Sequence, residues 1–396
     1  MRRRWVVLVL SALIMPGVPS AAGGQTLDKR LNDLLETVRL SHQVPGLAGA
    51  VVTGKGLEAV GAVGVRKWGT EVAVTAGDKW HIGSDTKAMT AAMIGRLVER
   101  GKLRWDSTVG EVFPEFAGAM TPGLQKVTLL HLLSHRSGLP ANTLWGLIPR
   151  TGTTRDQRLA VMKSVASLKL AADPGTKYLY SNLGYVIAGA MAEKAADTAW
   201  EDLMKTLLFE PLGMTGAGFG GLGTPGQIDQ PWPHGEDGRP VEKNGPDTDN
   251  PPVMGPAGTV HLTLADWGKF VADMLRGLGG EKALLRPETY QKLRTPPFGG
   301  DYALGWLTVE RDWGGGTVLT HSGSNTMNYA VVWIAPARGF AVLVVCNRGG
   351  QAAFKACDEA ASKLIQWRQG AAGSGLPKAT IRNAAERLAA AFLGDI

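Results

Sequence analysis

The stretch His81-Ile82-Gly83-Ser84-Asp85-Thr86-Lys87 decides how the rest of the sequence is interpreted. A serine is followed three residues later by a lysine, and an apolar-periodic segment, Met89 to Val98, comes directly after them. Residues three apart share one face of a helix, so a helix beginning here directs Ser84 and Lys87 to the same side. The first helical turn also stabilises negative charge. These are the components of an activated nucleophile, whereas a capping serine with a surface lysine explains the pattern without function.

Residues 1–22 have the pattern of a secretory signal peptide. Arg2-Arg3-Arg4 form a basic start, an apolar run follows from Trp5 to Met15, and Ser20-Ala21-Ala22 supply small residues for cleavage. A helix needs about 20 apolar residues to span a bilayer, so this run is too short. The sequence therefore predicts an exported protein, periplasmic or secreted, with no membrane span after cleavage. An uncleaved N-terminal anchor is the alternative.

The composition is that of a globular protein with a sizeable core. The 396 residues are 44% hydrophobic and 19% charged, with a formal net charge of +7. No basic run with interleaved aromatic residues follows the signal segment, so we expect no nucleic-acid partner. Two cysteines, Cys346 and Cys357, are too few for a disulfide scaffold. Two buried thiols are the default expectation, and a disulfide between them is the alternative.

The order of the predicted elements indicates one sheet built from both ends of the chain. An N-terminal helix is followed by a hairpin of two strands at 47–53 and 57–66. Residues 102–215 are mostly helical in pattern, and further strands lie between residues 303 and 346. We therefore expect an α/β (α+β) fold, with an antiparallel sheet flanked by helices and a mostly helical inserted lobe.

Two patterns within the chain have both structural and functional readings. The segment 218–256 is rich in Gly, Pro and Asp and is expected to be a long surface excursion. Its Trp232 and His234 either line a substrate groove or lie at exposed tips. His131 and His135 are four residues apart, a spacing that can bind a metal, but no third ligand is near in sequence. We therefore expect no metal site.

Two further motifs complete a set of three. Tyr180-Ser181-Asn182 precedes a predicted helix, and His321-Ser322-Gly323 ends a predicted strand. Together with Ser84-x-x-Lys87, and in this order, they resemble the motifs of the serine β-lactamase and penicillin-binding superfamily. The resemblance is to the branch of class C β-lactamases, DD-carboxypeptidases, D-aminopeptidases and related esterases. Supporting matches occur between about residues 28 and 368, in the segments 80–84, 130–140, 211–214, 256–260 and 304–306.

The resemblance implies a covalent mechanism. Ser84 attacks a carbonyl carbon and forms an acyl-enzyme, and a base within hydrogen-bond reach takes its proton. Lys87 and Tyr180 are both candidates for this base, and the two are expected to titrate as a pair. An ammonium beside a phenol is expected to lower the pKa of the phenol, which would let Tyr180 take the serine proton and pass it to the leaving group.

The remaining motif residues are implied to bind the substrate. Asn182 would hold Lys87 and hydrogen-bond a substrate amide. His321 would lie at the substrate, and Gly323 would let its strand approach the substrate closely. The backbone N–H groups of Ser84 and Ser324 would form the oxyanion hole. The polar pattern that follows Ser324, at residues 325–328, adds to the same wall and hints at a polar substrate.

One departure from the family pattern bears on the substrate. Lys-Thr-Gly, common in true β-lactamases, is replaced here by His321-Ser322-Gly323, and a histidine is mostly neutral near pH 7. This weakens the case for efficient β-lactam hydrolysis and leaves peptidase, amidase or esterase activity open. We predict an exported serine hydrolase at residues 23–370, with no metal or organic cofactor, followed at 371–396 by a linker and a tail or added helix.

The predicted substrate class remains broad at this point. It comprises D-amino-acid peptides, including cell-wall peptide, and small esters or amides. A class C-type β-lactamase is one alternative. A penicillin-binding sensor that is acylated without turnover is the other, because such a protein keeps the serine and fails at deacylation.

Overall fold

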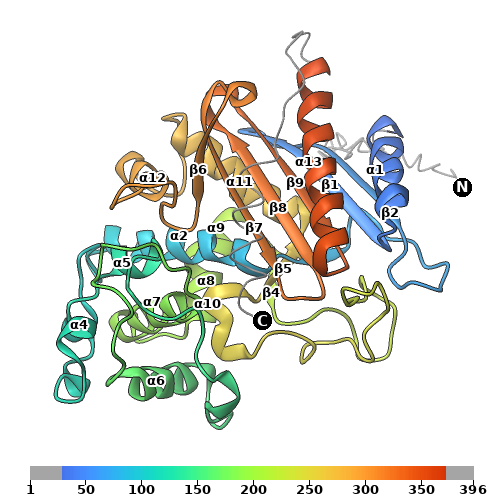
Figure 1. Ribbon diagram of the computed structural model, residues 1–396. Helices are drawn as coiled ribbons and strands as arrows, with labels where there is room; N and C mark the ends of the chain where they lie inside the picture. The colour runs from blue at the N-terminus through green and yellow to red at the C-terminus, as the bar shows by residue number, and fades with distance from the viewer. Residues whose placement is uncertain (1–28, 372–396) are drawn as a thin grey trace, which may run out of the picture.

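The computed structural model describes residues 29–371. The predicted signal peptide and nearly all of the predicted tail lie outside these residues. Six strands form the main sheet, in the order β2-β1-β9-β8-β7-β6, and every neighbouring pair is antiparallel. These strands are β1 (Gly46–Thr53), β2 (Gly56–Gly64), β6 (Leu307–Arg311), β7 (Gly316–Ser324), β8 (Tyr329–Ala335) and β9 (Phe340–Cys346). Because β1 pairs with β9, the two chain ends share one sheet, which confirms the predicted fold class (Figure 1).

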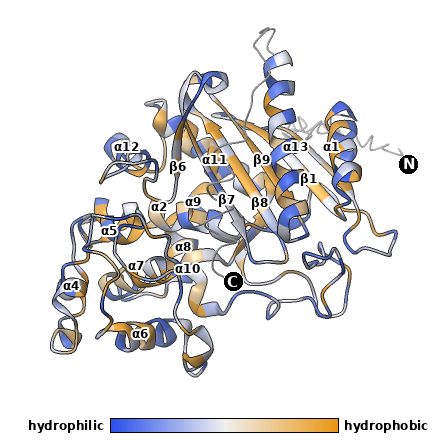
Figure 2. Ribbon diagram, in the orientation of Figure 1, coloured by the Kyte–Doolittle hydropathy of each residue, from blue (hydrophilic) through white to orange (hydrophobic). Residues whose placement is uncertain are grey.

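Helices cover both faces of this sheet, as the alternation of apolar residues along the strands requires. Leu47 and Val51 face α1 (Lys29–His42) and α13 (Gly350–Ala371), whereas Ala48 and Ala50 belong to the core that also contains α2 (Thr86–Glu99) and α11 (Leu264–Leu278). Figure 1 shows α1 and α13 in front of the sheet and α11 behind it. Figure 2 shows the central strands mostly hydrophobic, with hydrophilic stretches along α13.

The helical lobe lies between the two groups of strands in sequence, as predicted, and forms the lower left of Figure 1. Its main helix, α7 (Asn182–Ala196), is almost wholly buried and packs against several of its neighbours. The other helices are α3 (Val109–Val112), α4 (Pro122–Gln125), α5 (Leu129–Leu133), α6 (Thr154–Val165), α8 (Trp200–Met204) and α9 (Glu210–Leu212). A π-helical segment, Lys205–Phe209, joins α8 to α9.

A second, small sheet brings the nucleophile region against the main sheet. Its strands run in the order β3-β5-β4 and are β3 (Lys79–His81), β4 (Gly218–Phe219) and β5 (Val260–Thr263). Ser84 lies in a 3-10 turn, Gly83–Asp85, between β3 and α2. The sequence placed Ser84 in the first turn of the helix itself; α2 instead begins at Thr86. The turn still leaves Ser84 and Lys87 on the same side.

The segment 218–256 differs from the expectation for its two aromatic residues. It contains little regular structure, but Trp232 and His234 are buried and neither lines a groove nor forms an exposed tip. His234 Nδ1 lies 2.7 Å from Asn347 O, and its Nε2 accepts a hydrogen bond from the Trp68 backbone N–H. The segment ends in η5 (Pro252–Met254) and α10 (Gly255–Gly258), which return the chain to the nucleophile.

The remaining helix, α12 (Pro287–Arg294), lies before β6. The cysteines are buried and form no disulfide with one another, which agrees with the default expectation. Between residues 29 and 371, no helix combines the length and the apolar character needed to cross a bilayer.

Candidate active site

The three motifs meet at a pocket of about 300 Å³ between the sheet and the helical lobe. Ser84, Tyr180, Asn182 and Ser324 are among its lining residues. Ser84 comes from the turn before α2, Asn182 from the start of α7, and Ser324 from the end of β7. Lys87 and Tyr180, selected from distant segments of the sequence, therefore lie against the Ser84 hydroxyl, and Asn182 contacts Lys87.

Ser84 Oγ is held by two functional groups. Lys87 Nζ lies 2.8 Å from it, and the Tyr180 hydroxyl donates a hydrogen bond to it at 2.8 Å. Lys87 Nζ also donates to Asn182 Oδ1 at 2.8 Å and to the Ala257 carbonyl at 2.7 Å. Lys87 is fully buried, and these three polar contacts are all with protein groups. Both Lys87 and Tyr180 are within proton-transfer distance of Ser84.

Burial shifts the pKa values of both candidate bases. It lowers the Lys87 pKa well below its usual 10.5, against the opposing influence of the Asp85 carboxylate. Burial also raises the Tyr180 pKa well above 10, although the hydrogen bond to Ser84 lowers it. The expectation that a neighbouring ammonium lowers the phenol pKa is therefore wrong, because desolvation dominates. Burial therefore shifts Lys87 toward the neutral amine and Tyr180 toward the neutral phenol.

The turn that carries Ser84 is in backbone contact with the end of β7. A Cβ on Gly323 would lie 1.9 Å from Ile82 O and 2.5 Å from Ser84 N. Conversely, a Cβ on Gly83, whose φ is +50°, would lie 2.4 Å from Ser324 N. Only glycine fits at either position. The backbone nitrogens of Ser84 and Ser324, the two expected oxyanion donors, both lie at this contact.

His321 lies behind the pocket wall. It is fully buried and does not line the pocket; its Nε2 lies 2.9 Å from the Tyr302 hydroxyl and its Nδ1 lies 2.8 Å from Ser322 O. Burial and the nearby Lys87 lower the His321 pKa to about 3, so the ring is neutral. Asp85, 3.6 Å from its Nδ1, is buried without a hydrogen-bond partner, and burial raises the pKa of its carboxyl group.

Several lining residues were not selected from the sequence. They come from the segments 141–145 and 250–258, of which only the second overlaps a matched pattern, at 256–260, and they are Ala141, Asn142, Trp145, Asn250, Met254, Ala257 and Gly258. Asn142 follows directly on the matched segment 130–140, which was the one signal available for it. Asn325 and Thr326, noted in the sequence for their polarity, also line the pocket.

His135 is a further residue whose position was missed. It is fully buried and has a left-handed φ of +57°, and its ring centroid lies 4.3 Å from that of Tyr180. Its Nδ1 accepts a hydrogen bond from the Ser181 backbone N–H at 3.0 Å. His131, in contrast, caps α5 through Thr128. The described residues contain no group of three or more His, Cys, Asp or Glu able to hold a metal ion.

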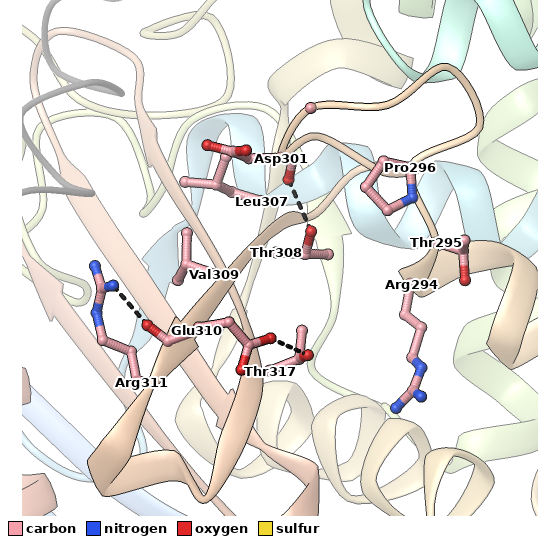
Figure 3. Close-up of a pocket in the computed structure, with 11 residues that line it drawn as sticks. Arg294, Thr295, Pro296, Asp301, Leu307, Thr308, Val309, Glu310, Arg311 and Thr317 are labelled. Atoms are coloured by element: carbon pink, nitrogen blue, oxygen red, sulfur yellow. Dashed lines mark hydrogen bonds between the residues drawn. The ribbon is translucent and has the colours of Figure 1, made fainter.

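A larger cavity, of about 660 Å³, lies elsewhere, beside the edge strand β6. Figure 3 shows its lining, in which the Thr308 hydroxyl donates to Asp301 O and Thr317 donates to Glu310. Arg294 and Arg311 also line it. No serine or cysteine nucleophile is among these lining residues, so the smaller pocket at Ser84 is the candidate active site.

Known proteins similar to this chain indicate its family. The model of the Beta-lactamase family matches residues 27–365, which is most of the chain. The chain belongs to the Beta-lactamase family. Over 345 residues it is 28% identical to penicillin-binding protein 4 of Amycolatopsis lactamdurans, covering 81% of this chain and 85% of that protein.

Other proteins similar to this chain are named for different activities. Esterase EstB of Burkholderia gladioli is 32% identical over 155 residues, which are 35% of this chain and 38% of the esterase. The solved structure of D-alanine carboxypeptidase AmpC from Burkholderia cenocepacia has the same fold, with a TM-score of 0.65, 22% identity, and coverage of 83% of this chain and 98% of that one. This Beta-lactamase family member is thus a serine hydrolase.

Proposed function

We propose that the protein hydrolyses small neutral esters and amides through an acyl-enzyme on Ser84. The observation that carries this proposal is the absence of charge in the pocket wall. Among the residues described by the structure, those lining the Ser84 pocket include no Lys, Arg, Asp or Glu. The wall is instead made of amide and hydroxyl side chains, together with Trp145 and Met254.

A charged substrate group would lose its hydration in this pocket without gaining a counter-ion, which is unfavourable. Penicillins and peptides ending in D-alanine both carry a carboxylate close to the bond that is cleaved. Lys87 is not available to pair with it, because Lys87 is buried and donates to Asn182 and Ala257. His321 is buried and neutral. The site therefore favours an uncharged ester or amide over a β-lactam or a D-alanine carboxypeptide.

The hydrogen-bond arrangement supports Lys87 as the base. A neutral amine has two N–H donors and one lone pair. Asn182 Oδ1 and Ala257 O accept the two N–H groups, which directs the lone pair to the Ser84 hydroxyl. Ser84 Oγ in turn accepts from Tyr180, so each donor has an acceptor. Lys87 then takes the Ser84 proton as Oγ attacks the carbonyl carbon.

The remaining steps balance protons between Lys87 and Tyr180. The oxyanion receives the N–H groups of Ser84 and Ser324, and Tyr180 donates its proton to the departing alcohol or amine. In deacylation, water attacks the acyl carbon and returns a proton to the Tyr180 phenolate. Lys87 returns the first proton to Ser84 Oγ, and the carboxylic acid leaves. The new Lys87 cation, 4.9 Å from the Tyr180 ring, stabilises the transient phenolate.

A matched pair of substrates tests the preference for neutral acyl groups. We expect kcat/KM for the methyl ester of 4-nitrophenyl succinate to exceed that for the free acid by about tenfold or more, which corresponds to roughly 1.4 kcal/mol. The two compounds share one leaving group and differ in the methyl group that removes the charge. Equal rates would contradict the proposal. Efficient turnover of a penicillin or of a D-alanyl-D-alanine peptide would favour the β-lactamase or carboxypeptidase reading, and a stable penicillin adduct the sensor.

We further propose that the protein is exported to the periplasm or secreted. The proposal rests on the basic, apolar and small-residue succession of residues 1–22. Protein purified from cells expressing the full-length chain is expected to have a mass that corresponds to a start near residue 23. A mass that retains Met1 would contradict cleavage.

A further inference from the structure

The two most exposed large apolar side chains of the described residues lie within two residues of Trp145, which lines the pocket. Leu144 is 71% exposed and Leu147 is 74% exposed, more than any other large apolar side chain between residues 29 and 371. Single exposed leucines are ordinary on protein surfaces. These two, however, belong to the same short turn as Trp145, η3 (Trp145–Leu147), and Trp145 lines the pocket. We call Leu144, Trp145 and Leu147 the apolar rim.

The apolar rim is tied to the catalytic groups by hydrogen bonds. Trp145 Nε1 donates to Asn142 Oδ1 at 3.2 Å, and Asn182 Nδ2 donates to the same oxygen at 3.1 Å. The backbone N–H of Asn182 also donates to Ala141 O at 2.8 Å. Asn182 holds Lys87, so the rim has a fixed position relative to the nucleophile. A group bound at Ser84 and extending outward would therefore meet Trp145 and the adjacent leucines.

We propose that the apolar rim binds an apolar chain or ring of the ester or amide substrate. This inference deepens the proposed function and depends on it. The polar wall of Asn142, Asn182 and Asn325 surrounds the scissile group, whereas the rim offers apolar surface at the mouth of the same pocket. Covering exposed leucine and tryptophan surface with an apolar group removes both from water. The apolar group belongs to either the acyl or the alcohol part of the substrate.

Two series of neutral esters show whether the acyl part or the alcohol part of the substrate lies on the rim. One is a set of 4-nitrophenyl acetate, butyrate and hexanoate, in which the acyl chain grows. The other is ethyl, butyl and hexyl acetate, in which the alcohol grows. We expect kcat/KM to rise by about tenfold along one series, since each buried methylene contributes to binding. The series that rises identifies the part of the substrate on the rim, and a flat response in both series overturns the proposal.

A double variant tests whether the rim causes the rise in kcat/KM with chain length. Leu144→Ser/Leu147→Ser is expected to remove most of the rise with chain length, so that the ratio of kcat/KM for the longest ester to that for the shortest falls toward one. Leu40→Ser/Leu159→Ser, which changes exposed leucines on α1 and α6, is the matched control and is expected to keep the full rise. If the rim variant keeps the rise, the proposal is wrong.

The outcomes separate this inference from the proposed function. Failure of the proposed function appears as poor hydrolysis of acetate relative to charged substrates. Failure of the rim inference appears as normal acetate hydrolysis with unaltered chain-length dependence. Light scattering of the rim variant adds a further outcome, since a change in oligomeric state without a change in chain-length dependence would make the rim a contact between copies of this chain and overturn substrate binding there.

Discussion

Ser84→Ala is expected to reduce kcat/KM for any accepted ester by about 10⁴-fold or more, in line with the loss of nucleophiles in other serine hydrolases. No other hydroxyl is placed between Lys87 Nζ and Tyr180 OH, each 2.8 Å from Ser84 Oγ. The change removes one oxygen from a buried position and leaves the other two Lys87 contacts in place. The fold should therefore survive, and the loss should be in the chemical step.

Ester hydrolysis and intact mass after reaction with an activated ester or a fluorophosphonate measure this loss. The wild-type protein should gain one acyl or phosphonyl group, and Ser84→Ala should gain none. Ser167→Ala, which changes an exposed serine after α6, serves as the control and should behave as wild type. Full hydrolysis by Ser84→Ala would show that the reaction does not proceed through this residue.

Lys87→Met is expected to reduce kcat/KM by about 10³-fold, the order contributed by a positioned general base. Methionine has a similar length and no charge, so it fills the buried space, but it leaves Asn182 Oδ1 and Ala257 O without the donor they have now. A lower thermal stability is expected for this reason, because unsatisfied buried acceptors cost about 1–3 kcal/mol each. Steady-state kinetics below the melting temperature of the variant separate the two effects.

The pH dependence identifies Lys87 as the base independently of the size of the loss. A base acts when deprotonated, so wild-type kcat/KM should fall as the pH falls through the Lys87 pKa, which burial places well below 10.5. Because the Tyr180 pKa is raised above 10, loss of its proton should not reduce activity below that pH. Lys87→Met should lose the acid limb, whereas Lys282→Met, an exposed control, should keep it. Retention of the same limb in Lys87→Met would assign it to another group.

The candidate site residues could be selected because each lies in a short local pattern. Ser84 and Lys87 are three residues apart, a spacing that places both on one side of a helix, and Tyr180 and Asn182 lie at the start of a strongly apolar helix. The sheet was predictable because its apolar strands lie at both ends of the sequence, and alternation along β1 assigns each side chain to a face. The spacing of residues within short segments and the order of the strands along the sequence were sufficient to predict these features.

Burial was not predictable, because it depends on contacts between distant segments. His234 was expected at a groove or an exposed tip. In the structure it is buried and contacts the Asn347 carbonyl, which lies more than a hundred residues later in the sequence. Desolvation likewise reversed the expected shift of the Tyr180 pKa. The apolar rim was missed for the opposite reason: Leu144 and Leu147 resemble core residues in sequence, and only the structure shows them exposed next to Trp145, which lines the pocket.

The contact between Gly83 and Gly323 has a consequence for how the protein is made. One side of this contact is synthesised early, with Ser84, and the other near the end, with Ser324. Strand β7 pairs with β6 and β8, and these strands join β1 through β9, so the strand that carries Ser324 is linked to the N-terminal strands only once residue 346 has been added. We therefore expect a chain that ends before β9 to contain the serine and its lysine but to have no hydrolase activity.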